Sequence, residues 1–306
     1  MRQLESVNKN TYNCFQFLVA TSAKFYDCDY RLTMLELWGF LYEKEANETI
    51  GDRLKLYWNY KTDRRKQLLN KHGLTFDITS ANAFDTAELI CDKPSNSLIA
   101  VYIDSFVCPW IPFYQKIHRP HALFFTDKVS ENFVYLDQYS ESSENNEIAV
   151  EFVKNHATSK IIFKPIEIRK YNVGDLLLEN LTNWKKYGFS HYETFISDMK
   201  DALDLSKEIV DDPLASKLIM FIKNLAEDRI NFIECIDFIE EISYIGLKTI
   251  KKCLIDIASR YEKLRAYIIK CAYSGRGHKI EIISNELDNI YSQEKKIYEE
   301  IHSILK

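Results

Sequence analysis

The chain has 306 residues, 46% of them hydrophobic and 13% aromatic, and its formal net charge at pH 7 is −5. This composition argues against a disordered protein, and the acidic balance argues against a nucleic-acid partner, since general nucleic-acid binders are normally basic. The first ten residues lack the apolar core of a signal peptide, and no apolar run approaches the roughly 18–20 residues of a membrane span. The seven cysteines are scattered without a C-x-x-C pair. They predict reduced thiols, a cytoplasmic protein and no structural zinc site.

Three helices are predicted in the first third of the chain. The first runs from Asn13 to Tyr26, with apolar side chains along one face, and Asp27-Cys28-Asp29 interrupts its pattern. The second resumes the helical pattern from Tyr30 to about Tyr42. The third covers Asp63 to Lys71 and ends before Gly73, because glycine is common just past a helix C-terminus.

Strands follow, and two of them predict a histidine–aspartate pair. The apolar runs place strands at about 98–106, 121–127, 132–138 and 160–170. The polar stretch Asp127–Glu131 is suited to a hairpin loop between the middle two. If Thr126 pairs with Asn132, His121 falls directly opposite Asp137. Cross-strand partners have Cβ atoms about 4.5–5.5 Å apart, so the carboxylate would orient the imidazole at one end of a sheet.

The second half of the chain has helical periodicity and no convincing strand. Three long helices are predicted, from Pro213 to about Ile239, from Ile245 to Cys271 and from Ile280 to Leu305. The chain therefore divides into a domain of residues 1–171 and an α-helical bundle region of residues 172–306. That region packs on the first half or is a dimerisation element, which leaves a homo-oligomer open. Glu141–Glu147 is most simply an exposed acidic loop, and Ser274–Gly277 a turn between helices.

A histidine–aspartate pair needs a nucleophile, and no G-x-S-x-G elbow offers a serine. Two cysteines stand next to a predicted helix start: Cys14 after Asn13, and Cys28 beside Asp29. A helix N-terminus lowers a thiol pKa, and its free N–H groups can stabilise an oxyanion. The aspartates around Cys28 oppose a thiolate, which favours Cys14. The alternative for either cysteine is a small buried hydrophobe.

The loop from Cys108 to Pro120 carries aromatic side chains and a histidine. Trp110, Phe113 and Tyr114 would line a pocket for an acyl chain, or anchor the loop on the core. His118 is a loop residue at the rim of such a cleft. With His121 it lacks the fixed helical spacing of metal ligands, so no metal site is expected.

A basic cluster stands out on this acidic chain. It consists of Lys61, Arg64, Arg65, Lys66 and Lys71. A solvated helix face explains it most simply, and contact with an acidic carrier protein or a phosphopantetheine phosphate is the functional alternative.

The order of the candidate residues resembles that of papain-like cysteine proteases, with a cysteine at a helix start, a histidine at a strand start and an aspartate at the end of the next strand. Within that superfamily the chain resembles the family typified by the N-terminal domain of butirosin biosynthesis protein H, and in particular its relatives in polythioamide (closthioamide-type) assembly. The motifs shared in order are Asn13-Cys14, Tyr26-x-x-Asp29-Tyr30, Trp38-Gly39-Phe40, Asp104-x-Phe106 and the segment from Pro109 to His121. The resemblance covers roughly the first 170 residues, and the helical second half resembles the family in character.

The resemblance implies an α+β, papain-like fold with a helical C-terminal region. It implies a cysteine-dependent acyltransferase that moves an acyl chain from a carrier-protein thioester to an amine or diamine in nonribosomal-peptide or polythioamide biosynthesis. Cys14 would attack the thioester, His121 would move protons and Asp137 would hold the imidazole tautomer. No cofactor is implied beyond the phosphopantetheine that carries the substrate.

Two points stay open at this level. Papain-like enzymes place an oxyanion-hole glutamine six residues before the cysteine, where this chain has the shorter amide of Asn8, with Asn10 and Asn13 as further candidates. The same triad would also serve a hydrolase, either a peptidase or a thioesterase. A non-catalytic scaffold that binds a carrier protein is the third interpretation.

Overall fold

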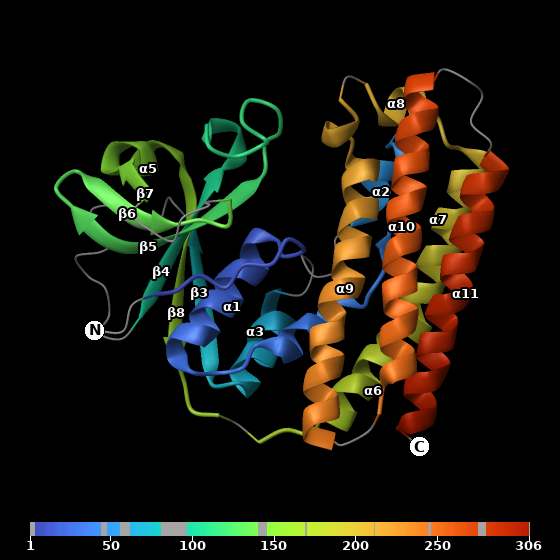
Figure 1. Cartoon of the computed structure of the whole chain (residues 1–306), viewed down its shortest axis with the longest axis horizontal. Coiled ribbons are helices and arrows are strands. Elements are labelled where there is room, and N and C mark those ends of the chain that lie inside the picture. The colour runs from blue at the N-terminus through green and yellow to red at the C-terminus, as the bar shows by residue number, and fades with distance from the viewer. Residues whose placement is uncertain are drawn as a thin grey trace. The chain divides into compact units, whose positions relative to one another are not determined.

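The computed structural model describes residues 4–43, 48–55, 62–80, 97–139, 146–168, 170–210, 212–243, 246–274 and 280–305. The fold is mixed α+β, with antiparallel sheets and a helical C-terminal region (Figure 1). The chain forms two compact units. The first comprises Met1–Tyr30 and Lys66–Lys170, and the second comprises Arg31–Arg65 and Tyr171–Lys306.

The first unit is built on a six-stranded antiparallel sheet with the strand order β3-β8-β4-β5-β6-β7. Its strands are β3 (Leu74–Ser80), β4 (Leu98–Asp104), β5 (Pro120–Val129), β6 (Asn132–Leu136), β7 (Asn146–Ala149) and β8 (Ala157–Pro165). Its helices are α1 (Cys14–Tyr26), α3 (Thr62–Lys71, shared with the second unit), the 3-10 turn η4 (Ser105–Val107) and α5 (Val150–His156).

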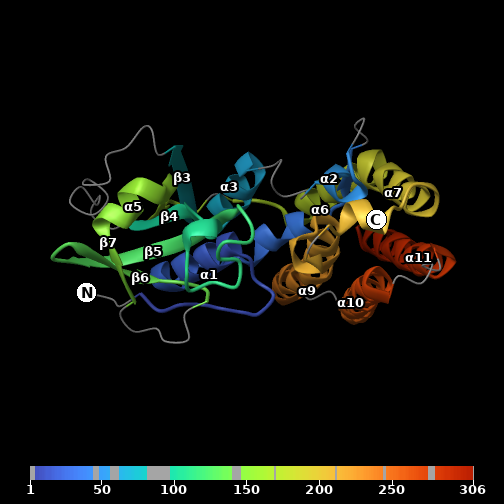
Figure 2. The same cartoon turned by 90° about the horizontal axis from the view of Figure 1, so that it is seen from above.

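The sheet separates two apolar cores because its side chains alternate between its faces. Leu98 and Ala100 of β4 lie in the core that contains the buried side chains of α1. Ile99, Val101 and Ile103 of the same strand lie in the other core, with Val150 and Val153 of α5. Figures 1 and 2 show α1 in blue and α5 in green against this sheet. Even-numbered positions of β4 therefore belong to the α1 face.

Both ends of α1 are set by local chemistry. Asn13 is the N-cap: its side chain accepts a hydrogen bond from the Gln16 amide, and the Gln16 side chain accepts one from the Asn13 amide. This reciprocal capping box satisfies two backbone donors at the helix start. At the other end, Asp27 adopts φ +55° and its N–H bonds to the last turn. The predicted helix from Asn13 to Tyr26 is confirmed.

The second unit is largely helical. Its elements are η1 (Arg31–Leu37), β1 (Leu41–Tyr42), α2 (Ile50–Arg53), β2 (Leu54–Lys55), α6 (Val173–Asn183), the π-helical turn η5 (Trp184–Gly188), α7 (Phe189–Asp201), α8 (Leu205–Glu208), η6 (Pro213–Ala215), α9 (Lys217–Ser243), α10 (Lys248–Ser274) and α11 (Ile280–Ile304). Helix α10 packs against α9 and α11, and α9 also packs against η1 (Figure 1).

The three long predicted helices are confirmed, although α9 begins only after the 3-10 turn at Pro213. Within the described residues, none of the helices combines the length and apolar character that a membrane span requires.

The segment after α1 differs from its prediction. In place of a helix from Tyr30 to Tyr42, the chain forms the 3-10 helix η1 and then strand β1. The segment Arg31–Arg65 also belongs to the helical unit, and the predicted single division between residues 171 and 172 does not include it. The later boundary between the two units lies between Lys170 and Tyr171. The reason is long-range packing: the Trp38 ring lies 5.3 Å from that of Trp184 and 5.4 Å from that of Phe232.

The predicted hairpin register is wrong, although the hairpin itself is confirmed. Val129 pairs with Asn132 and Phe124 with Leu136, with a bulge after Phe125. The connecting turn holds two residues rather than five, and Ser130 adopts φ +55° within it.

Other strand bounds also differ from the predictions. Strand β4 ends at Asp104, where η4 begins, and β8 starts at Ala157 and ends at Pro165. Strand β3 was not predicted, and β7 begins inside the predicted acidic loop, whose residues 141–145 lie outside the described residues.

Candidate active site

Cys14 is the first residue of α1, and its thiol meets the backbone at the start of β5. Its Sγ lies 3.8 Å from the carbonyl oxygen of Pro120, to which it donates a hydrogen bond. The backbone N–H groups of Ala122 and Phe15 also point at this sulfur. The thiol is thus held against the two residues that flank His121.

The surroundings of Cys14 favour the neutral thiol. Burial raises the pKa of this thiol to about 11. The Arg119 guanidinium and the Ala122 N–H lower the pKa without offsetting burial, and the Asp137 carboxylate raises it further. In the resting protein Cys14 is therefore protonated at neutral pH.

His121 and Asp137 form a buried pair. The Nε2 atom of His121 lies 2.9 Å from Oδ2 of Asp137, and each residue is only 3% exposed. The register places Asp137 one step beyond the last β5–β6 pair, so His121 is its diagonal rather than its direct neighbour, on the same face of the sheet. The hydrogen bond to Nε2 leaves Nδ1 as the other ring nitrogen for proton transfer.

Two further groups hold the Asp137 carboxylate. The indole Nε1 of Trp110 donates to Oδ2 at 2.5 Å, and the Tyr139 backbone N–H donates to Oδ1 at 3.0 Å. The Tyr139 ring also lies 5.5 Å from the His121 ring. Trp110 was predicted to line an acyl pocket or to anchor the loop on the core, and the structure places its indole N–H on Asp137. The sequence around Trp110, which lies between two prolines, does not predict this contact. The contact forms because Asp137 follows β6, far along the chain from the loop.

Cys14 donates to the Pro120 carbonyl and His121 bonds to Asp137, and no hydrogen bond joins the thiol to the imidazole in the described part of the chain. The charge of Asp137 nevertheless acts on the Cys14 thiol. Catalytic hydrogen bonds are often long or misaligned before substrate binds, so a thiol–imidazole bond that is absent here can form in the substrate complex. The arrangement combines a thiol at a helix N-terminus, an imidazole and a carboxylate that orients it.

The three asparagines before the helix take separate positions. Asn8 donates from its side chain to the carbonyl of Gln138 at 2.6 Å, and Asn13 caps α1. Asn10 is an exposed turn residue. A different candidate for an oxyanion donor is the backbone N–H of Cys14 itself, which opens α1 and has no acceptor among the described residues. The capping pattern N-C-F-Q is the signal from which this donor could have been inferred.

Cys28 stands in the opposite electrostatic setting from Cys14. It follows the C-terminus of α1, where its N–H bonds to the Ala23 carbonyl, and no helix starts at Asp29. Burial and the charges of Asp27 and Asp29 all raise the pKa of its thiol. The helix start expected beside Cys28 is therefore absent, because the chain continues into a 3-10 turn from Arg31.

The other predicted loop residues make their described contacts with partners other than His121 and Asp137. Phe113 stacks under the Arg119 guanidinium, 3.4 Å from its ring centre. Tyr114 is 39% exposed. His118 pairs with Asp104 rather than with His121. Among the described residues no group of three or more His, Cys, Asp or Glu side chains is placed to hold a metal ion.

The predicted basic cluster is not a uniform open face. Arg64 pairs with Glu36 and Glu179, and Lys66 pairs with Asp77. Arg65 is buried, and Lys61 lies outside the described residues. Much of this positive charge is thus neutralised within the chain.

No family model matches the chain, and a search of curated proteins finds no relative of significant similarity.

Proposed function

We propose that the chain is a cysteine-dependent acyltransferase whose first unit is a papain-like domain. It would move an acyl group from a carrier-protein thioester through Cys14 to an amine or diamine, as in nonribosomal-peptide or polythioamide biosynthesis. The observation that carries this proposal is the buried His121–Asp137 pair, whose carboxylate acts on the Cys14 thiol at the start of α1. The resemblance to the butirosin biosynthesis protein H family supplies the substrate class.

The first half-reaction forms an acyl-enzyme. His121 takes the Cys14 proton as the sulfur attacks the thioester carbonyl carbon. The N–H of Cys14 stabilises the resulting oxyanion, and collapse breaks the original C–S bond. The departing phosphopantetheine thiolate takes the proton back from His121, so the carrier leaves as a free thiol.

The second half-reaction transfers the acyl group. The amine nitrogen attacks the Cys14 thioester, a C–N bond forms and the C–S bond breaks. His121 takes a proton from the attacking nitrogen and returns it to Cys14. The thioester is already activated, so the reaction needs no ATP.

Transfer is preferred to hydrolysis because the pair is shielded from water. His121 and Asp137 are nearly fully buried, and the rings of Trp110 and Tyr139 contact them. An acyl-enzyme that excludes water favours a bound amine as acceptor.

The test is intact-protein mass spectrometry after mixing the protein with a phosphopantetheine-linked acyl thioester. Wild type and Cys28→Ala should gain the acyl mass, and Cys14→Ala should not. His121→Ala should lower the acylation rate about 10²–10⁴-fold, and Asp137→Ala should lower it less, because Asp137 orients and does not react.

Other outcomes decide between the alternatives. Discharge by added amine to an amide supports the transferase, whereas discharge to free acid regardless of amine makes the protein a hydrolase. An adduct on Cys28 would reject Cys14 as the nucleophile. No adduct on any variant with several donors would favour the carrier-binding scaffold.

A further inference from the structure

A second histidine–aspartate pair lies at the same end of the sheet. Nδ1 of His118 lies 2.6 Å from Oδ2 of Asp104, and the His118 ring stacks on Phe106 with ring centres 4.1 Å apart and an 11° angle. The Asp104 side chain is 32% exposed and that of His118 is 70% exposed. Asp104 and Phe106 thus hold the ring in place, while most of the His118 side chain is exposed to solvent.

This pair is connected to the Cys14 site through Pro120. Asp104 is the cross-strand partner of Pro120, whose carbonyl accepts the hydrogen bond from Cys14. Asp104 is also an even-numbered position of β4, and Leu98 and Ala100 place that set on the α1 face of the sheet. Both the nucleophile and the second pair therefore lie where β4 ends, β5 begins and α1 starts.

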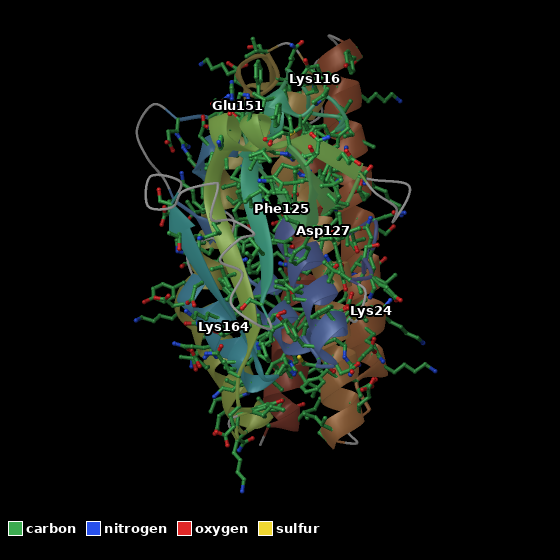
Figure 3. The ribbon with its side chains drawn as sticks, turned by 90° about the vertical axis from the view of Figure 1, so that its left-hand side faces the viewer. Lys24, Lys116, Phe125, Asp127, Glu151 and Lys164 are labelled. Atoms are coloured by element: carbon green, nitrogen blue, oxygen red, sulfur yellow. The ribbon has the colours of Figure 1, made fainter. Side chains whose placement is uncertain are left out.

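Figure 3 also shows how α1 is directed relative to the loop that carries His118. Lys116, two residues before His118, lies at one end of the first unit, and Lys24, close to the C-terminus of α1, lies far from it. The start of α1 is thus directed toward the end that carries the loop.

The loop is also held by contacts other than the second pair. Three other hydrogen bonds close the loop: Ser105 N–H to the Arg119 carbonyl at 2.8 Å, Ser105 Oγ to the Ile117 carbonyl at 2.6 Å, and Gln115 N–H to the Phe106 carbonyl at 3.0 Å. An exposed ion pair adds little to stability by itself. Asp104 is held in turn, because its Oδ1 accepts the Phe106 N–H at 3.0 Å.

We propose that His118, positioned by Asp104, forms the site that receives the amine acceptor and removes its extra proton. The acceptor would be a primary amine that arrives as an ammonium ion. Nε2 of neutral His118 takes one proton from it, leaving the free amine to attack the acyl group on Cys14, and His118 then releases that proton to solvent. This inference rests on the proposed function.

The test starts from the acyl-enzyme of the full chain, prepared with excess acyl thioester, and follows its discharge by mass spectrometry. His118→Gln should acylate at the wild-type rate, and its discharge to a primary alkylamine at neutral pH should fall about 100-fold, the scale of general acid–base catalysis. Discharge to hydroxylamine, which is unprotonated at that pH, should stay at the wild-type rate. A structural lesion would slow both amines equally.

Two variants serve as controls. Asp104→Asn keeps the acceptor for the Phe106 N–H and removes the carboxylate, and it should show the same selective loss to a smaller extent. His156→Gln is the matched substitution: His156 lies against Phe152 at 4.6 Å on the α5 face and pairs with no described carboxylate. It should behave as wild type.

Two results would overturn the inference. If wild type forms both acyl-enzyme and amide while His118→Gln discharges alkylamine at the wild-type rate, the amine site is elsewhere and the proposed function stands. If wild type forms no acyl-enzyme, the proposed function fails and the amine site fails with it.

Discussion

Cys14 illustrates how burial and charge act together on one atom. The N-terminus of α1, Arg119 and the Ala122 N–H all favour a thiolate, yet burial dominates and raises the pKa of the thiol to about 11. A preformed thiolate–imidazolium pair is therefore not the resting state. Under the proposed function, His121 would then act as a general base at the moment of attack, and acylation would depend on it more strongly than simple alkylation does.

This resting state predicts a specific pH dependence. The rate of Cys14 alkylation by iodoacetamide should be low at pH 7, should still rise above pH 9 and should level off only near pH 11, since the thiolate fraction grows until pH passes the pKa. Peptide mass spectrometry reports the modification of Cys14 separately from the other cysteines. His121→Ala should leave this profile nearly unchanged while acylation by thioester is lost. A plateau below pH 7 would instead show a preformed ion pair.

At the scale of elements, a buried ion pair joins two helices of the second unit. Nε of Arg229, on α9, lies 2.6 Å from Oε1 of Glu294, on α11, and both side chains are fully buried. The indole of Trp38 donates to the other carboxylate oxygen at 2.8 Å, and Arg229 also donates to the Leu37 carbonyl at 2.9 Å. The network connects the segment after α1 to the helical bundle.

Removing one partner of this pair should be costly. Arg229→Met leaves the Glu294 charge buried without its counter-charge, and we expect the free energy of unfolding to fall by about 3–5 kcal/mol. Urea unfolding followed by tryptophan fluorescence measures the loss. The double variant with Glu294→Gln, which keeps an acceptor for Trp38, should recover much of it.

An exposed pair between α7 and α11 is the matched control. Lys200 and Asp288 lie 3.1 Å apart with side chains 42% and 49% exposed. Lys200→Met should change the free energy of unfolding by at most about 1 kcal/mol. Equal losses for the buried and exposed pairs would contradict the assigned role of burial.

At the scale of the whole molecule, the chain leaves the first unit after Tyr30 and re-enters it at Lys66. The intervening segment buries Leu32, Leu35, Trp38 and Phe40, each at most 2% exposed. Burial of a large apolar side chain contributes about 1.5–3 kcal/mol. Four of them contribute roughly 6–12 kcal/mol, comparable to the whole stability of a domain.

A fragment of residues 1–171 should therefore fail to behave as a domain. It retains this apolar segment and lacks the helices of the second unit, so we expect aggregation in size-exclusion chromatography and no cooperative thermal transition by circular dichroism. The same fragment with Leu35→Lys and Trp38→Lys should aggregate less. A monomeric fragment 1–171 that unfolds cooperatively would show that the segment does not need the second unit.

Local patterns in the sequence determined the long helices and the capped start of α1. Three helices of 25–27 residues follow from a repeat close to 3.6, and Asn13 followed by Gln16 is a local capping signal. Placing His121 at the start of one strand and Asp137 at the end of the next required only two apolar runs and a polar gap. These features depend on residues within a few positions of one another, and that is why the sequence alone is sufficient for them.

The tertiary structure decided what depends on distant residues. The two-residue turn and the bulge in β5 set the hairpin register, so His121 meets Asp137 diagonally. Trp110 reaches Asp137 only because its loop folds back over β6, and Trp38 belongs to the second unit because Glu294, 256 positions later, accepts its indole hydrogen bond. Such contacts are selected by packing and by the need of buried polar groups for partners, and no local periodicity encodes them.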